Sequence, residues 1–376
     1  MSGGHLVHGM GTALEAPTWP AITLVEAKAA LDHFPAAGRL IDLRWHSPRP
    51  FSAAALIETD RGIHFLKRHH RQLRTPAALA EEHGFMAHLR IAGLSVPDVV
   101  PTRDGASAIA LEEWTYELHR AAPGMDLYRD RQSWTPFLTS AHAHEAGAAL
   151  GRLHQAAQGF AAPARGDHPL VASFTILPAR DPLAAAEAYV AARPALSGWL
   201  ADRSWRREMK RLLDALGNGV AERLSALPPL WTHGDWHPSN LLWSDDGTVR
   251  SNIDFGLATR TCALHDIATA IERTAFRWLE LGMYDALGDV DAALAILTGY
   301  RSVIPLDQGE VDVVMRLLPL VHMEFALSEI DYFAGIVGDP DQAVVAWQDY
   351  LIGHAEWFLT APGQDFLDRL AKKASA

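Results

Sequence analysis

The sequence predicts an α+β fold in which a small part built on an antiparallel sheet precedes a larger, mainly helical part. Residues 38–122 contain short apolar runs that alternate with polar residues and are separated by turn signals, as in a strand meander. Beyond Gly124 most of the chain is rich in Ala and Leu with helical spacing. At about 150 residues per domain, 376 residues suggest two or three domains, and the boundary is predicted near residue 123.

The composition is that of a globular protein, because 49% hydrophobic residues exclude a disordered or collagen-like chain. A net charge of −12 without a long run of Lys or Arg argues against binding to a phosphate backbone. A single cysteine excludes an internal disulfide, and no stretch reaches the about 18–20 apolar residues of a spanning helix. The N-terminus lacks the basic and apolar regions of a signal peptide. We therefore expect a soluble, cytoplasmic protein without nucleic-acid or membrane partners.

The first 37 residues are expected to form an N-terminal arm and a short helix. Residues 1–20 are rich in Gly, Pro and small residues, which favours a loose arm. Residues 24–34 have a helical pattern.

The small part is predicted to be a sheet with one inserted helix at 76–92. In its third strand Ile63, Phe65 and Lys67 share one face, because side chains alternate along a strand. The predicted strands are residues 39–44, 53–59, 63–70, 106–112 and 116–119.

The larger part is predicted to be helical except for one segment. Residues 230–256 combine short apolar runs, turn signals and clustered polar residues. The predicted helices are residues 143–153, the stretch 182–226, and three or four more from residue 263 onward.

Three polar residues in the segment 230–256 have a spacing that is typical of kinases. Asp235 and Asn240 are five positions apart, and Asp254 follows 14 residues later in Ile253-Asp254-Phe255-Gly256. The runs 241–243 and 249–253 suit two strands joined by a turn at 245–247. Such a hairpin would bring Asn240 and Asp254 to one end of a ribbon.

Phosphoryl transfer requires this set of side chains. Mg²⁺ prefers hard oxygen ligands, which the amide of Asn240 and the carboxylate of Asp254 supply. The acceptor hydroxyl needs a carboxylate that orients it and takes its proton, and Asp235 begins the loop that Asn240 ends. Protein kinases place a base, a metal-binding amide and a metal-binding carboxylate in this order.

Two other interpretations compete with this one. The segment could be a polar turn that caps one element, with Asp254 as an ordinary turn residue. His233 and His237 could instead be metal ligands, but Gly234 stands where the helical zinc signature has Glu, and Pro238 breaks a helix.

The motif resembles that of the aminoglycoside phosphotransferase and choline kinase superfamily. The likeness rests on residues 233–242 (HGDWHPSNLL) followed by 253–256 (IDFG), with Gly where protein kinases carry Arg. It extends more loosely over residues 38–275. The resemblance implies a protein-kinase-like fold of two lobes, a sheet lobe at 38–122 and a mainly helical lobe at 123–376, with the site in the cleft.

The resemblance also implies roles for residues outside the motif. Lys67 would reach the nucleotide α- and β-phosphates and would pair with Glu82, or with Glu81 one residue earlier. Backbone groups from Arg120 to Ala122 would meet adenine. Asp266 matches a family residue with a structural part.

The resemblance therefore implies a kinase that uses ATP and Mg²⁺ to phosphorylate a hydroxyl of a small molecule. Asp235 would be the base, and Asn240 and Asp254 would hold the metal. Two alternatives stay open: a Ser/Thr protein kinase of the bacterial stress-response type, and a non-catalytic nucleotide-binding regulator.

The acceptor class stays open among aminoglycosides, amino alcohols such as choline, sugars, homoserine and macrolides. We expect the acceptor near Trp236, which follows the base, and near Glu324 and Asp331. These two carboxylates are seven residues apart in a predicted helix and so project from one side. Such a stripe would favour a cationic or polyhydroxyl acceptor.

Overall fold

The computed structural model describes residues 5–166, 168–171 and 173–375, so the first four residues of the predicted arm lie outside it. The chain forms two compact units. Unit 1 consists of Met1–Gly124 and Ser251–Ile253, and unit 2 consists of Met125–Arg250 and Asp254–Ala376. Unit 1 is built on an antiparallel sheet and unit 2 is mainly helical, which confirms the predicted α+β class.

Unit 1 contains a six-stranded sheet in the order β3-β4-β5-β8-β6, with β7 paired to β8, among its described residues. The predicted meander is its first half. The strands are β1 (Val7–His8), β2 (Leu14–Glu15), β3 (Leu40–His46), β4 (Ala53–Thr59), β5 (Gly62–His70), β6 (Asp98–Val99), β7 (Ile109–Leu111) and β8 (Trp114–Arg120). The helices are α1 (Leu24–Leu31), a 3₁₀ turn (Pro35–Ala37) and α2 (Pro76–Ile91).

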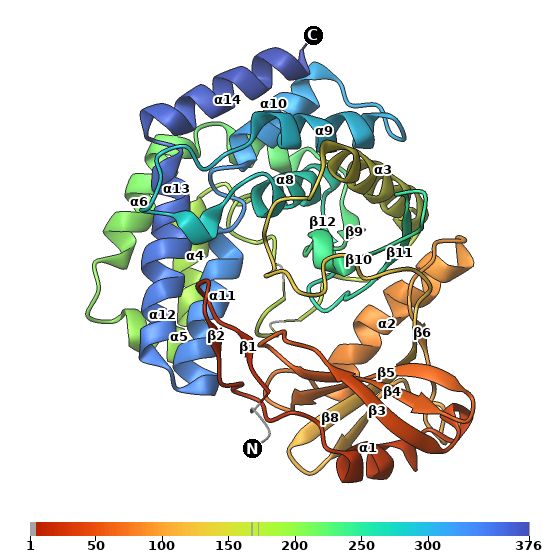
Figure 1. Ribbon diagram of the computed structural model, residues 1–376. Helices are drawn as coiled ribbons and strands as arrows, with labels where there is room; N and C mark the ends of the chain where they lie inside the picture. The colour runs from red at the N-terminus through yellow and green to blue at the C-terminus, as the bar shows by residue number, and fades with distance from the viewer. Residues whose placement is uncertain (1–4, 167, 172, 376) are drawn as a thin grey trace. The chain divides into compact units, whose positions relative to one another are not determined.

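The alternation of side chains along the strands gives the sheet two different faces. Leu66 and Leu118 are register partners in β5 and β8, and both are buried in an apolar core with α1. The adjacent register pair consists of Lys67, which follows Leu66, and Glu117, which precedes Leu118. This pair therefore lies on the opposite face of the sheet. Helix α2 covers that face, so α1 and α2 lie on opposite sides of the sheet (Figure 1).

The N-terminal arm is more ordered than its composition predicts. Strands β1 and β2 pair antiparallel, and Val7 is buried. The backbone N–H of His8 donates to the carbonyl of Pro48 at 2.8 Å, and Nη1 of Arg49 lies 2.9 Å from Nδ1 of His8. The arm is thus held by the turn after β3. Contacts between residues about 40 positions apart cannot be predicted from the local composition.

Unit 2 carries two pairs of short strands and a set of helices. Its strands are β9 (Leu230–Thr232), β10 (Leu241–Trp243), β11 (Val249–Asn252, whose end lies in unit 1) and β12 (Thr259–Thr261). Its α-helices are α3 (Ser140–Ala157), α4 (Pro182–Ala191), α5 (Pro194–Leu200), α6 (Trp205–Leu216), α7 (Val220–Ser225), α8 (Ala263–Thr274), α9 (Val290–Arg301), α10 (Gln308–Leu317), α11 (Met323–Asp331), α12 (Pro340–Val345), α13 (His354–Trp357) and α14 (Ala361–Ala374). Short 3₁₀ turns (Pro238–Asn240, Trp278–Glu280) and two π-helical segments (Tyr332–Val337, Ala346–Gly353) complete it.

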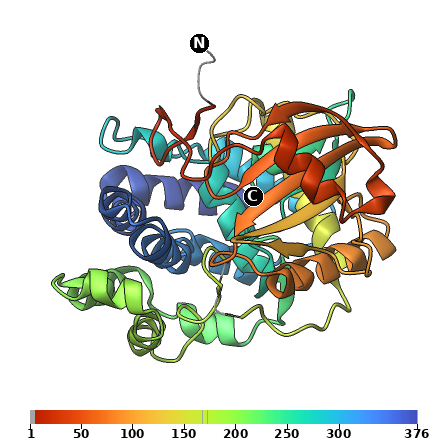
Figure 2. The ribbon, with the colours of Figure 1, turned by 90° about the horizontal axis from the view of Figure 1, so that it is seen from below.

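Helices pack closely within unit 2. α4 and α6 lie side by side in both views (Figures 1 and 2). α3 and α9 approach backbone to backbone, because a Cβ at Gly147 would lie 2.1 Å from the carbonyl oxygen of Ile296. A Cβ at Gly299 would likewise lie 1.8 Å from the carbonyl oxygen of His144. Within the described part of the chain, no helix combines the length and apolarity needed to cross a membrane.

Candidate active site

The loop from His233 to Asn240 follows β9 and carries the predicted base. Every residue of this loop is buried except Asp235, whose side chain is 14% exposed. Pro238 opens the 3₁₀ turn that ends at Asn240, since proline fixes the backbone angle required there. A buried loop that exposes one carboxylate is suited to present that carboxylate to a substrate.

The backbone of this loop is fixed by a buried carboxylate from α8. Asp266 accepts hydrogen bonds from the N–H groups of His233 at 3.0 Å and Gly234 at 2.9 Å. His154 of α3 lies 3.0 Å from the same carboxylate. Burial by itself would raise the pKa of Asp266, but His154, the charge of His233 and the N–H of Gly234 together leave this pKa below its ordinary value. Gly234 has φ +72°, a left-handed conformation that favours glycine.

The carboxylate of Asp235 is held from two sides. The Arg273 guanidinium of α8 donates to Oδ1, and the indole N–H of Trp134 lies 3.5 Å from the same oxygen. The amide nitrogen of Asn240 donates to Oδ2 at 3.1 Å and to the backbone carbonyl of Asp235 at 2.9 Å. Arg273 is itself buried and lies over the ring of Trp134.

Asn240 and Asp254 are the predicted metal ligands, and both belong to unit 2. Because the amide nitrogen of Asn240 faces Asp235, its amide oxygen is turned away and can coordinate a cation. Asn240 directly precedes β10 and Asp254 follows β11, and these strands pair as the predicted hairpin requires. Asp254 has φ +58°, a conformation that is uncommon outside glycine and that clusters at functional sites. The donor set of one amide and one carboxylate oxygen fits Mg²⁺.

The predicted nucleotide-binding residues belong to unit 1. Lys67 lies on β5 and is half-buried, and Glu82 is buried on α2. Their pairing stays a prediction, with Glu81 as the alternative. The register adds a third acidic residue, because Glu117 of β8 lies directly opposite Lys67.

The predicted adenine contacts lie where β8 ends. Arg120 is the last residue of β8, and its exposed side chain lies 3.5 Å from Asp98. The next N–H, that of Ala121, donates to the carbonyl of Ile63 at 3.0 Å. The contact of adenine with Arg120 and Ala122 stays a prediction.

The structure gives the three predicted acceptor residues internal partners. Trp236 is buried, and its indole N–H donates to the carbonyl of Ala146 at 3.2 Å. Glu324 is buried and accepts from the backbone N–H groups of Thr175 and Ile176. Asp331 accepts from the N–H of Leu196 at 3.1 Å. Their role in acceptor binding stays a prediction, and none of these bonds requires a ligand.

Several residues near the predicted sites were not found from the sequence. Arg273 and Trp134 contact Asp235 from 38 and 101 positions away, and neither belongs to a motif. Glu117 lies three residues before Arg120, and alternation from Lys67 across the sheet would have indicated it only if the register had been known.

A comparison of the sequence with known protein families agrees with this arrangement of residues. A model of the phosphotransferase enzyme family matches residues 51–306. The chain belongs to this family. The resemblance to the aminoglycoside phosphotransferase superfamily is thereby confirmed, and the chain is a kinase that phosphorylates a hydroxyl group.

Individual family members resemble the phosphotransferase over most of its length. The homoserine kinase of Acidiphilium cryptum (strain JF-5) is 27% identical over 314 residues, which cover 84% of this chain and 87% of that relative. The solved structure of a microcompartment-associated aminopropanol kinase has a TM-score of 0.60 at 20% identity and covers 91% of this chain and 99% of its own. An amicoumacin kinase, solved with AMP-PNP and Ca²⁺, has a TM-score of 0.53 at 17% identity, with 93% and 92% covered. These structures share the kinase-like fold class.

Proposed function

We propose that this phosphotransferase transfers the γ-phosphoryl group of ATP, with Mg²⁺, to the hydroxyl of a small amino-acid-type alcohol of the homoserine class. The observation that carries the proposal is Asp235, the one partly exposed residue of a buried loop whose backbone is fixed by Asp266. A carboxylate held in this way can orient a hydroxyl and accept its proton as the bond to phosphorus forms.

The other side chains take the roles that phosphoryl transfer requires. Asn240 and Asp254 would hold Mg²⁺, which neutralises phosphate charge when it is bound. Lys67, held by Glu82, would contact the α- and β-phosphates. Asn240 has a second task, because its amide nitrogen holds the Asp235 carboxylate at 3.1 Å.

The surroundings of Asp235 favour a small acceptor with charges of both signs. A cavity of about 10 Å³ in unit 2 is lined by Gly234, Arg273 and Glu272, by imidazole and hydroxyl groups, and by the apolar side chains of Val321 and Phe325. A cavity of this size with polar partners holds one water molecule, which a carboxylate or ammonium group of a ligand can displace. A guanidinium that contacts the base, and a carboxylate in the same cavity lining, suit the two charged groups of an amino acid.

The relatives support this acceptor class. The kinase of Acidiphilium cryptum named above acts on homoserine by its name, and it aligns with most of this chain. The aminopropanol kinase names a second candidate, an amino alcohol that has no carboxylate. The guanidinium of Arg273 favours homoserine over this second candidate.

An acceptor screen tests the proposal. The purified protein is supplied with ATP and Mg²⁺ and offered L-homoserine, 1-amino-2-propanol, choline, sugars, aminoglycosides and a generic protein substrate, and ADP release is measured. We expect the highest kcat/KM with L-homoserine and a phosphomonoester product by ³¹P NMR. A preference for an aminoglycoside or a protein, or no ADP release with any acceptor, would contradict the proposal.

A variant of Arg273 tests the carboxylate contact. Arg273→Gln is expected to raise the KM for L-homoserine by about 10–100-fold, because a hydrogen bond to a charged group is worth about 1.5–3 kcal/mol. The KM for ATP should not change. Arg277→Gln, an exposed arginine one turn further along the chain, is the control. An equal loss with L-homoserine and with 1-amino-2-propanol would mean that Arg273 only positions Asp235.

A further inference from the structure

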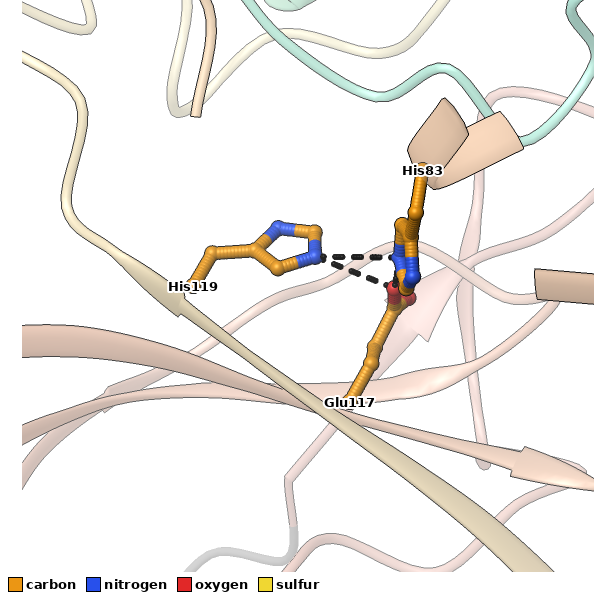
Figure 3. Close-up of side chains that lie close together, drawn as sticks. All are labelled: His83, Glu117 and His119. Carbon is orange, nitrogen blue, oxygen red and sulfur yellow. Dashed lines mark hydrogen bonds and ion pairs between the residues drawn. The ribbon is translucent and has the colours of Figure 1, made fainter. Parts of the chain in front are cut away.

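A cluster of histidines surrounds one carboxylate in unit 1, outside the residues assigned to phosphoryl transfer. Glu117 is 1% exposed, and its two oxygens are approached by three imidazoles. Nε2 of His83 and Nε2 of His119 lie 2.6 Å and 3.0 Å from Oε2, and Nε2 of His69 lies 2.9 Å from Oε1. The two imidazoles that share Oε2 also face each other, with 3.4 Å between their Nε2 atoms (Figure 3).

We infer that His83, Glu117 and His119 bind a divalent transition-metal ion of the zinc class. Two imidazole nitrogens and one carboxylate oxygen are a ligand set of zinc sites that keep a position for water. The three ligand atoms converge on one point from two elements, since His83 projects from α2 and the other two from β8 (Figure 3).

The separations of the ligand atoms fit such an ion. Bonds of about 2.0–2.1 Å in a tetrahedron place neighbouring ligand atoms about 3.3 Å apart. The three observed separations are 2.6, 3.0 and 3.4 Å. The largest already equals the tetrahedral value, and the shortest requires an opening of less than 1 Å.

A second observation supports the site, because Glu117 already has an outer partner. His69 holds Oε1 and leaves Oε2 directed at the other two imidazoles. Ligating carboxylates and imidazoles commonly have such a hydrogen-bonded partner, which fixes their orientation.

A cavity of about 420 Å³ in unit 1 reaches one of the three proposed ligands. His83 lines this cavity together with Arg90 and Asp98. A buried ligand set needs such an entry path.

The described residues contain one other His and Glu cluster, which provides a matched control. Glu272, His322 and His354 of unit 2 also gather their ligand atoms within 4.8 Å of one another. There only the contact between His354 Nδ1 and Glu272, at 2.8 Å, is within hydrogen-bond distance, and Nε2 of His322 faces the carbonyl of Leu351 at 3.0 Å. This cluster is looser, so we expect His354→Gln to leave metal binding unchanged.

The test uses Co²⁺ as a spectroscopic probe on the full-length, chelator-treated protein. Excess Mg²⁺ is present throughout, so that the oxygen ligands Asn240 and Asp254 do not take up cobalt. We expect one equivalent of Co²⁺ to bind with the intense visible bands of a four- or five-coordinate site, and Zn²⁺ to displace it. His83→Gln and His119→Gln should abolish these bands, whereas His69→Gln should weaken binding by about 10–100-fold, as the loss of an outer partner does.

Two results would overturn the inference: no Co²⁺ band in the wild-type protein, or a band that is lost in His354→Gln and kept in the His83 and His119 variants. If a variant does not fold, crystals of the wild-type protein soaked in Zn²⁺ decide the question by anomalous scattering at the zinc edge. A peak within bonding distance of His83, Glu117 and His119 supports the site. A peak elsewhere, or none, overturns it.

Discussion

At the scale of the residue, the carboxylate of Asp235 is both reachable and fixed. Arg273 holds Oδ1 and Asn240 holds Oδ2, so the group has little freedom to rotate. Pre-orientation of this kind contributes to catalysis because the entropy of positioning is lost before the reaction begins.

Asp235→Asn is expected to lower kcat by about 100- to 10,000-fold, the usual contribution of a general base. The affinity for ATP should be nearly unchanged, because the base contacts the acceptor. Steady-state kinetics and calorimetric titration with an ATP analogue measure the two effects. Asp246→Asn, in the exposed turn between β10 and β11, serves as control. Retention of most of kcat would show that Asp235 is not the base.

Asp254→Ala should remove the tightening of ATP binding by Mg²⁺, since Asp254 is the one carboxylate among the predicted metal ligands. Titrations with and without Mg²⁺ measure the effect, and Asp245→Ala is the control for a neighbouring turn residue. We expect the two dissociation constants of the variant to become equal. A persistent effect of Mg²⁺ would assign the ion to other residues.

At the scale of the element, the contact between α3 and α9 depends on two glycines. The backbones meet where Gly147 and Gly299 leave no room for a Cβ. The same two helices also position Asp266. Nδ1 of His154, on α3, lies 2.9 Å from the hydroxyl of Tyr300, on α9, and Nε2 of His154 lies 3.0 Å from the Asp266 carboxylate. The close packing of two helices thereby supports the carboxylate that fixes the backbone next to Asp235.

Gly299→Ala should destabilise the protein by about 1–3 kcal/mol, because the new methyl group overlaps backbone atoms that cannot move aside. Gly198→Ala is the matched control, since a Cβ at Gly198 in α5 meets nothing within 4 Å and alanine favours a helix. Urea unfolding at one pH compares the two variants with the wild-type protein. Equal stability of both variants would contradict the close approach of α3 and α9.

At the scale of the whole molecule, buried carboxylates make stability depend on pH. Burial raises the pKa of Glu329 from 4.5 to about 8, and that of Glu272 to about 7. Between the unfolded and folded values the native state binds a proton that the unfolded state has lost. The free energy of unfolding therefore falls as pH rises from about 4.5 to about 8, and the stability is fully present only below the unfolded pKa.

Glu329→Gln should remove part of this dependence. We expect the variant to match the wild-type protein near pH 5 and to exceed its free energy of unfolding by about 3–5 kcal/mol near pH 8, at about 1.4 kcal/mol per pKa unit. Thermal unfolding over this pH range measures the difference, with the exposed Glu222→Gln as control. A difference that does not vary with pH would mean that Glu329 is ionised in the folded state.

The sequence by itself determined the fold class and most strands and helices, and it predicted the residues of the candidate site. Strand alternation and helical spacing are local properties, so β4 and α2 lie within one residue of their predicted bounds. Asp235, Asn240 and Asp254 form a pattern within 20 positions, which a reader of the sequence can recognise.

Only the tertiary structure decided what surrounds these residues. Arg273 contacts Asp235, and Asp266 accepts hydrogen bonds from the backbone at 233–234. Strand register and helix packing bring His69, His83 and His119 around Glu117. The sequence predicts that Glu324 and Asp331 lie on one helix. Their hydrogen-bond partners, the backbone N–H groups of Ile176 and Leu196, cannot be predicted from residue spacing. The physical reason is the same in each case: hydrogen bonds and burial depend on which distant segments come together, and a periodic pattern fixes only which side of an element a residue occupies.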